Sequence, residues 1–123
     1  MAPADLRSFL WCFFGFRGRL SREPYLLGLL AMTLLATLSL APLMDVQEEQ
    51  MRISEYALPI VLISNVVQFA LVIKRLHDFG KTGLYSVIIV VPIVNIVFAL
   101  ALALIPGNPG QNRYGDMANV PPA

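Results

Sequence analysis

Three long stretches without Asp, Glu, Lys or Arg constrain this chain more than any other feature. They cover residues 25–44, 57–73 and 84–105 of the 123-residue chain. A helix that crosses the hydrocarbon core of a bilayer needs about 20 apolar residues, with a range of roughly 17–25. The composition agrees, because only 14% of the residues are charged, against about 25% in an ordinary soluble domain. We therefore expect an all-α integral membrane protein with three transmembrane helices, forming a single membrane domain over residues 1–123.

The segment before the first stretch has the composition of a membrane surface element. Residues 1–24 contain "FLWCFFGF", which is strongly apolar but too short to span, followed by "RGRLSR". Aromatic rings and arginines both fit the membrane–water interface. We expect a short interfacial amphipathic segment here, and then a helix that starts near Ser21 with Glu23 and Pro24 in its first turn. The Gly- and Pro-rich tail, residues 106–123, should be irregular.

The basic residues between the stretches predict the orientation. Four Lys or Arg residues lie in segment 1–24, one in connector 45–56 and three in connector 74–83. The positive-inside rule places the first and third of these segments in the cytoplasm. The N-terminus is then cytoplasmic in a multi-pass topology, and the acidic connector 45–56 faces outward.

The third stretch contains Pro92, which leaves the side of the tail open. Proline removes a backbone donor and clashes with the preceding turn. We expect a full crossing with a kink, which puts the tail outside. The alternative is a re-entrant hairpin, which would return the tail to the cytoplasm and would need protein to cover its turn.

The connector "KRLHDFGKTG" concentrates charge between two apolar stretches. If the second helix continues into it, Arg75 and Asp78 share a helix face, and Gly80 ends the helix. One interpretation is a capped helix end with local ion pairs. In the other, Asp78 fixes Arg75 so that its remaining donors bind a phosphate or carboxylate, and His77 adds a group that titrates near neutrality.

Polar residues inside the apolar stretches predict helix contacts. Asn65 and Gln68 lie on one side of the second helix, with Ser64 just beyond, and Asn95 of the third stretch is the expected partner of this intramembrane polar stripe. On the first stretch, Thr33, Thr37 and Ala41 form a ridge of small residues. This ridge packs either within the monomer or in an oligomer.

Several kinds of chemistry have little support. The chain holds one His and one Cys, too few for a recognisable metal site or disulfide. It has neither a nucleophile elbow nor a Gly-rich phosphate loop. The net charge of +1 gives no indication of nucleic acid. We therefore expect no enzyme activity, catalytic residue, metal or cofactor.

Three motifs together resemble a known family. They are "FRGRLSREPY", "KRLHDFGKTG" and "PGNPGQNRYG", and their order around the apolar stretches is similar to that in the bacterial inner-membrane family called domain of unknown function 805. The matching positions are Gly18, Arg19, Arg22, Tyr25, Arg75, Leu76, His77, Asp78, Gly80, Lys81, Gly83, Pro106, Gly107, Pro109, Gly110, Asn112, Arg113, Tyr114 and Gly115. The chain departs from the pattern at Leu26, Leu84 and Tyr85, where the family often has Trp. The resemblance implies a location in the bacterial inner membrane and assigns no activity.

The leading functional hypothesis is a non-enzymatic membrane module. A cytoplasmic basic collar would bind anionic lipid headgroups or a membrane-protein partner, although the positive-inside signal alone would need the same charges. The collar consists of Arg17, Arg19, Arg22, Lys74, Arg75 and Lys81. The candidate binding residues are Arg19, Arg22, Arg75, His77, Asp78 and Lys81, with the tail motif Asn112, Arg113, Tyr114 and Gly115.

Two alternatives remain open. One is a small oligomeric transporter or channel, whose polar pore would be lined by Ser64, Asn65, Gln68 and Asn95. The other is a membrane-embedded enzyme in which His77 and Asp78 act as an acid–base pair. The expected partners are the bilayer with its anionic lipids and either a second copy of the chain or another membrane protein.

Overall fold

The computed structural model describes residues 6–40 and 51–121, with the backbone alone described at 40 and 51–56. Throughout these residues the regular elements are helices, which confirms the all-α prediction. They are α1 (Leu6–Phe14), α2 (Arg22–Leu40), α3 (Met51–Asp78), the 3₁₀-helix η3 (Gly83–Val90) and α4 (Val94–Leu104). Residues 41–44 of the first expected span, which include Ala41 of its small-residue ridge, and residues 45–50 of connector 45–56 lie outside the described part.

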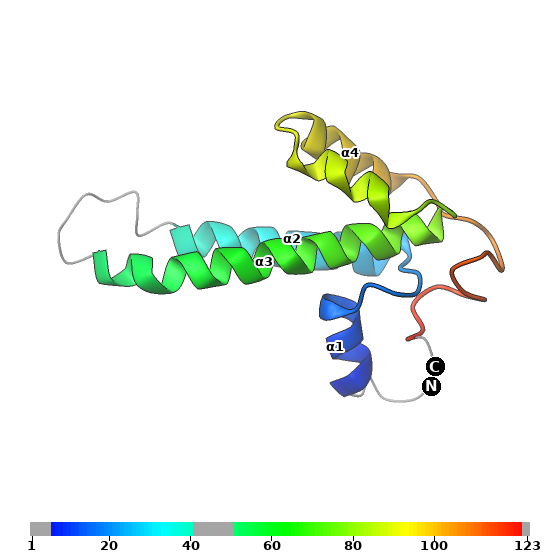
Figure 1. Cartoon of the computed structure of the whole chain (residues 1–123), viewed down its shortest axis with the longest axis horizontal. Coiled ribbons are helices and arrows are strands. Elements are labelled where there is room, and N and C mark those ends of the chain that lie inside the picture. The colour runs from blue at the N-terminus through cyan, green and yellow to red at the C-terminus, as the bar shows by residue number, and fades with distance from the viewer. Residues whose placement is uncertain (1–5, 41–50, 122–123) are drawn as a thin grey trace.

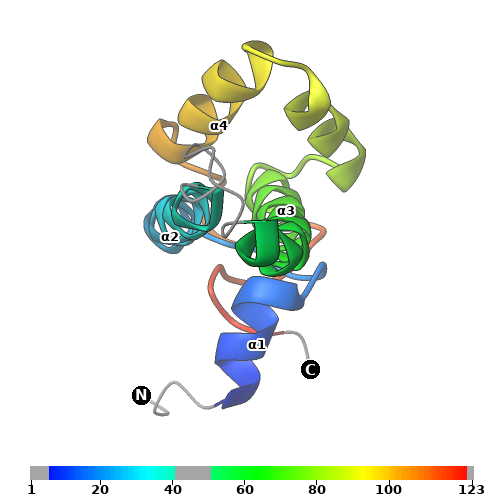
Figure 2. The same cartoon turned by 90° about the vertical axis from the view of Figure 1, so that its left-hand side faces the viewer.

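Helices α2 and α3 form the long axis of the molecule (Figure 1). They lie side by side and run in opposite directions, as the end-on view in Figure 2 also shows. Gly28 allows the close approach, because a Cβ at this position would lie 2.9 Å from Cδ1 of Leu71. Around this contact Leu20, Tyr25, Val67 and Leu71 are almost completely buried. The core therefore lies between these two helices and the end of α4, which contributes Leu102 and Ala103, and it is nearer the C-terminal end of α3.

The third apolar stretch, residues 84–105, is a hairpin, so the expected kinked helix is wrong and the chain takes the hairpin form of the alternative. η3 ends at Val90, and α4 begins at Val94 and returns beside it (Figures 1 and 2). Pro92 cannot donate to the preceding turn, while its carbonyl accepts from Val94 N at 2.8 Å. Ile93 takes a positive φ of 70°. The run of β-branched residues around the proline also has low helix propensity, so the chain turns and brings the tail back to the end of α3 where the hairpin started.

Helix α1 lies on the opposite side of the α2–α3 pair from the hairpin and runs across α3 (Figure 1). It is a helix of nine residues, which agrees with the short apolar segment expected there. Its position at a membrane surface stays a prediction. The tail after Leu104 is irregular apart from an isolated bridge between Asn112 and Gly115.

Within the described residues, one helical segment is long and apolar enough to cross a bilayer, namely Ala57–Asp78 of α3. The described part of α2 has 19 residues and starts with Arg22 and Glu23. Of the three predicted transmembrane helices, one therefore has the length and composition needed to cross a bilayer.

Candidate functional site

Asp78 is the centre of a buried cluster at the C-terminal end of α3. Its carboxylate accepts from Arg19 Nε at 3.0 Å and from Arg75 Nη1 at 2.6 Å. The exposed fractions of Arg19, Arg75 and Asp78 are 2%, 0% and 4%. Buried charges require this kind of pairing, because an isolated one is strongly destabilising. We call these three residues the Arg–Asp cluster.

Arg75 connects the cluster to the hairpin. Its Nε donates to the carbonyl of Leu102 at 2.6 Å, and its Nη2 donates to the carbonyl of Ile105. Leu102 is in the last turn of α4 and Ile105 is its C-cap, and at this end of a helix carbonyls lack intrahelical donors and a positive charge is favourable. Nη1 also donates to Leu20 O at 3.3 Å, and the guanidinium lies 4.6 Å from the centre of the Phe79 ring. Each of its nitrogens therefore has an internal partner.

Arg19 connects the cluster to the tail. Its Nη1 donates to the carbonyls of Gly110 at 2.5 Å and Gly115 at 3.1 Å, and its Nη2 donates to Asn108 O at 2.8 Å. Asn108 N in turn donates to the backbone carbonyl of Asp78 at 2.7 Å. Gly107 fits beside Asp78 because it has no side chain, since a Cβ there would clash with the carboxylate. The irregular tail is thus held by specific bonds.

His77 lies beside the cluster and contacts two other segments. Its Nδ1 is 2.9 Å from the carbonyl of Gly18, and its ring stacks on Tyr114 with centroids 4.1 Å apart and planes 4° apart. Asn112 Nδ2 donates to His77 O at 2.9 Å, and its Oδ1 accepts from Tyr114 N at 2.9 Å. Gly18 takes a φ of 94°, which favours glycine. The three sequence motifs therefore meet at this end of α3.

Lys74 holds α1, a role that the sequence did not indicate. Its ammonium donates to the carbonyls of Trp11, at 2.5 Å, and Cys12, and lies 4.6 Å from the centre of the Trp11 ring. The side chain is completely buried. Burial raises the pKa of the neighbouring Cys12 thiol, against the opposing effect of the Lys74 charge, so this thiol remains a neutral packing group. In the sequence, only the aromatic side chain of Trp11, which precedes the first motif, could have indicated this contact.

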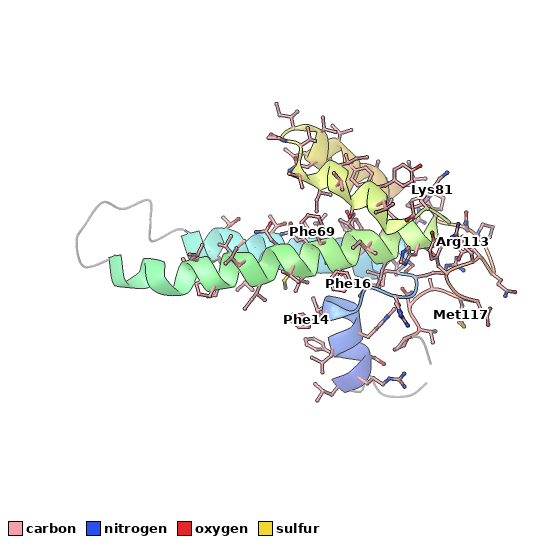
Figure 3. The ribbon with its side chains drawn as sticks, viewed as in Figure 1. Phe14, Phe16, Phe69, Lys81, Arg113 and Met117 are labelled. Carbon is pink, nitrogen blue, oxygen red and sulfur yellow. The ribbon has the colours of Figure 1, made fainter. Side chains whose placement is uncertain are left out.

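The other bases lie at the surface. Arg17, Arg22, Lys81 and Arg113 are exposed, and Figure 3 shows Lys81 and Arg113 at the end of the molecule that holds the Arg–Asp cluster. Arg22 Nη1 makes one long bond of 3.4 Å to Leu104 O. Next to it is an open cleft of about 350 Å³, whose lining includes Arg22, the cluster and Asp116. Arg22 is the exposed guanidinium of this cleft, whereas those of Arg19 and Arg75 are buried and paired within the protein.

The predicted intramembrane polar residues do not bond to one another. Asn65, Gln68 and Asn95 line a single groove between the hairpin and the α2–α3 pair, but Asn65 Nδ2 donates to Val61 O of its own helix. Ser64 is fully buried and donates to Ile60 O at 2.8 Å, and it is not part of the groove lining. In the described part of the chain no three His, Cys, Asp or Glu side chains come together as a metal site would need.

Comparison with protein families agrees with the arrangement of the motifs. A family model described as "Protein of unknown function (DUF805)" matches residues 13–116. This range contains all three motifs and confirms the resemblance seen in the sequence. Comparisons with curated proteins and with solved structures give no match.

Proposed function

Because this chain belongs to the DUF805 family of proteins of unknown function, its activity has to be inferred from its surface, and we propose that it is a non-enzymatic membrane module that contacts anionic lipid headgroups. The exposed bases Arg17, Arg22, Lys81 and Arg113, which we call the basic rim, would make this contact.

One observation carries the proposal, namely how charge and apolar surface are divided over the molecule. The outward sides of α2, α3 and the hairpin expose large apolar side chains, which a soluble monomer rarely presents on such a scale. Those with exposed fractions of 49–69% include Leu27, Leu30, Leu34, Leu62, Ile63, Val66, Val87, Val90, Ile96, Val97 and Leu100. Three bases of the rim, by contrast, lie near the Arg–Asp cluster, because Arg22 lines the same cleft and Lys81 and Arg113 lie at that end of the molecule (Figure 3). A bilayer that covers the apolar sides would bring its headgroups to this rim.

The proposed placement has α3 crossing the bilayer, with the Arg–Asp cluster at the cytoplasmic interface. The hairpin enters from that side and returns to it. The eleven residues of α4 rise about 16 Å, roughly half of a hydrocarbon core of about 30 Å. Helix α1 runs across α3 (Figure 1), so it would lie in the membrane plane with exposed Phe9 and Phe14 in the lipid interface.

The basic rim is smaller than the collar expected from the sequence. Arg19, Lys74 and Arg75 are buried and paired inside the protein, which leaves Arg17, Arg22 and Lys81 of that collar. Arg113 joins them, because the hairpin returns the tail to this end. Each basic residue near an anionic surface contributes about 1 kcal/mol. The rim therefore retains enough charge to prefer anionic over zwitterionic lipid.

The contacts of His77 and Asp78 favour the non-enzymatic interpretation. The Asp78 carboxylate is held between two guanidiniums, and the His77 ring is held by Gly18 O and by stacking on Tyr114. An acid–base pair would need both groups to face a common substrate site. The two side chains instead serve different contacts within the fold.

The lipid preference can be measured with the single tryptophan, Trp11. In liposomes, brominated phosphatidylglycerol should quench its fluorescence more strongly than brominated phosphatidylcholine does. The triple variant Arg17→Gln/Arg22→Gln/Lys81→Gln should lose most of this preference. The matched control, Arg17→Lys/Arg22→Lys/Lys81→Arg, keeps the charge and should keep the preference. An unchanged preference in the Gln variant would overturn the headgroup proposal.

The membrane placement has a separate test. Compartment-sensitive reporters fused to either end of the chain should both report the cytoplasm, because the hairpin returns the tail to the side of the lead-in. A periplasmic C-terminus together with a cytoplasmic N-terminus would contradict the re-entrant placement.

A further inference from the structure

A groove of about 710 Å³ lies between the hairpin and the α2–α3 pair. Figure 3 shows Phe69, one of its lining residues, beneath the hairpin. Most of the lining is apolar, and none of the residues that line it carries a formal charge. Four polar side chains interrupt this lining, and they are Thr33, Asn65, Gln68 and Asn95.

The amides in this groove lack the partners that other polar groups of the same helices have. The hydroxyls of Thr37, Ser39 and Ser64 each donate to a carbonyl one turn earlier. Gln68 and Asn95, by contrast, have no side-chain hydrogen bond to any described residue, and Asn65 uses only its Nδ2. An amide has two donors and an acceptor oxygen. The groove therefore presents donors and acceptors in apolar surroundings.

The depth of the groove limits what can satisfy these amides. Gln68 and Asn65 precede Asp78 by ten and thirteen residues, which corresponds to about 15 and 20 Å along α3. With Asp78 at the interface, they lie near the middle of a hydrocarbon core of about 30 Å. Phospholipid headgroups stay at the interface, and the core holds no water to bond to polar groups. At this depth the fitting partner is a polar group of another protein segment.

We propose that a second copy of this chain covers the groove, in a symmetric dimer whose Gln68 and Asn95 amides hydrogen-bond across the interface. One amide can both donate to and accept from another amide. The surface patches that meet at a two-fold interface are identical, so each must be complementary to itself. Thr33 and Thr37 are exposed on α2, and side chains of this size allow a neighbouring helix to approach. The inference rests on the proposed membrane location of α3 and is independent of headgroup binding.

Association in liposomes tests the role of the amides. Energy transfer between labelled copies, measured over a range of protein-to-lipid ratios, should show a monomer–dimer equilibrium. Gln68→Leu/Asn95→Leu should weaken it by about tenfold, because hydrogen bonds on both copies are lost. Ser64→Ala removes a hydroxyl that is satisfied within its own helix and should leave it unchanged. A wild-type monomer at every ratio, or equal association of the double variant, would overturn the dimer.

Cross-linking tests which face of the molecule forms the dimer interface, and it leaves the amides unaltered. It therefore tests the dimer even if the double variant does not fold. In a Cys12→Ala background, Thr33→Cys should be joined between copies by a short thiol-specific cross-linker. Leu34→Cys is the matched control, because Leu34 is its exposed neighbour but does not line the groove. Equal cross-linking at both positions would overturn the proposed face. If the protein is instead a monomer that retains a bound lipid, and the double variant loses this lipid, then the lipid and not a second copy occupies the groove.

Discussion

The two polar regions of this molecule differ in how far their side chains are hydrogen-bonded within the chain. In the Arg–Asp cluster, every nitrogen of both guanidiniums has a partner within the chain. In the groove, the Gln68 and Asn95 amides have no hydrogen-bonding partner among the described residues. A saturated polar network stabilises one arrangement of the chain, whereas polar groups without partners favour association with another molecule. The comparison assigns the cluster to folding and supports the proposal that the groove serves assembly.

The sequence separations across the cluster support this assignment. The Arg19–Asp78 bond joins residues 59 positions apart, and the Arg19–Gly115 bond joins residues 96 positions apart. Contacts between such distant segments close the fold around the end of α3. The motifs therefore hold the lead-in, the hairpin and the tail together, and the basic rim is carried on the resulting surface.

Asp78→Asn should produce the largest loss of stability. The amide has nearly the shape of the carboxylate but leaves two buried guanidiniums without a counter-charge. Removing one partner of a buried pair costs about 3–5 kcal/mol. The free energy of unfolding in a detergent titration would measure it. Asp116→Asn is the control, because Asp116 lines the same cleft but is exposed, and it should change stability by less than about 0.5 kcal/mol. Equal effects of the two variants would place the Asp78 pairs among weak surface contacts.

Arg75→Lys should have the next largest effect, of about 2 kcal/mol, since an ammonium cannot reproduce the planar set of donors. Nε and Nη2 of Arg75 meet the carbonyls of Leu102 and Ile105, while Nη1 meets Asp78. A single Nζ reaches one of these groups of acceptors and leaves others buried and unpaired. The same unfolding titration applies, with Arg113→Lys as the exposed control. If the Lys variant had wild-type stability and a weaker preference for anionic lipid, Arg75 would be a headgroup-binding residue and not a structural one.

Gly107→Ala should cost about 1–3 kcal/mol, because the added methyl group overpacks a tight contact. The contact is with the Asp78 carboxylate, so the cost should depend on that residue. A double-mutant cycle with Asp78→Ala, which removes the carboxylate that the methyl group would meet, measures the dependence. The Gly107→Ala effect should shrink in the Asp78→Ala background, because the overlapping group is absent. Additive effects would indicate that the two residues stabilise the chain separately.

The sequence was sufficient to predict that the fold is all-α, although only one described helix meets the length and composition of a predicted span, and it was sufficient to predict the pairing of Arg75 with Asp78. Both follow from local rules, namely apolar run length and residues three apart on a helix. It was also sufficient to identify Asn65, Gln68 and Asn95 as a related set of polar residues. The path of the third stretch was not decided by run length, because Pro92 permits either a kink or a turn.

The sequence could not predict which of the remaining basic side chains are buried and which are exposed. Arg19 and Arg22 have similar surroundings in the motif "FRGRLSREPY", yet one is buried and the other exposed. The difference comes from the tail, about 90 residues later, which covers Arg19 and supplies its acceptors. Lys74 was assigned to the surface for the same reason, since the carbonyls that hold it belong to α1. Long-range acceptors of this kind are carbonyls, and a backbone carbonyl has no signature in a sequence.

Tyr114→Leu should give the smallest effect on the cluster side of the comparison, about 1 kcal/mol. It removes the ring that stacks on His77 at 4.1 Å and keeps an apolar side chain, so the loss is that of an aromatic pair beyond area burial. Tyr114→Phe retains the ring and should stay close to wild type. Tyr85→Leu makes the same change at a half-exposed site on η3. Proteolysis of the tail under native conditions reports the effect, with faster cleavage for Tyr114→Leu alone. If Tyr114→Phe were cleaved as fast as the Leu variant, the hydroxyl and not the stack would hold the tail, and the paired contacts at this end would extend beyond the guanidiniums.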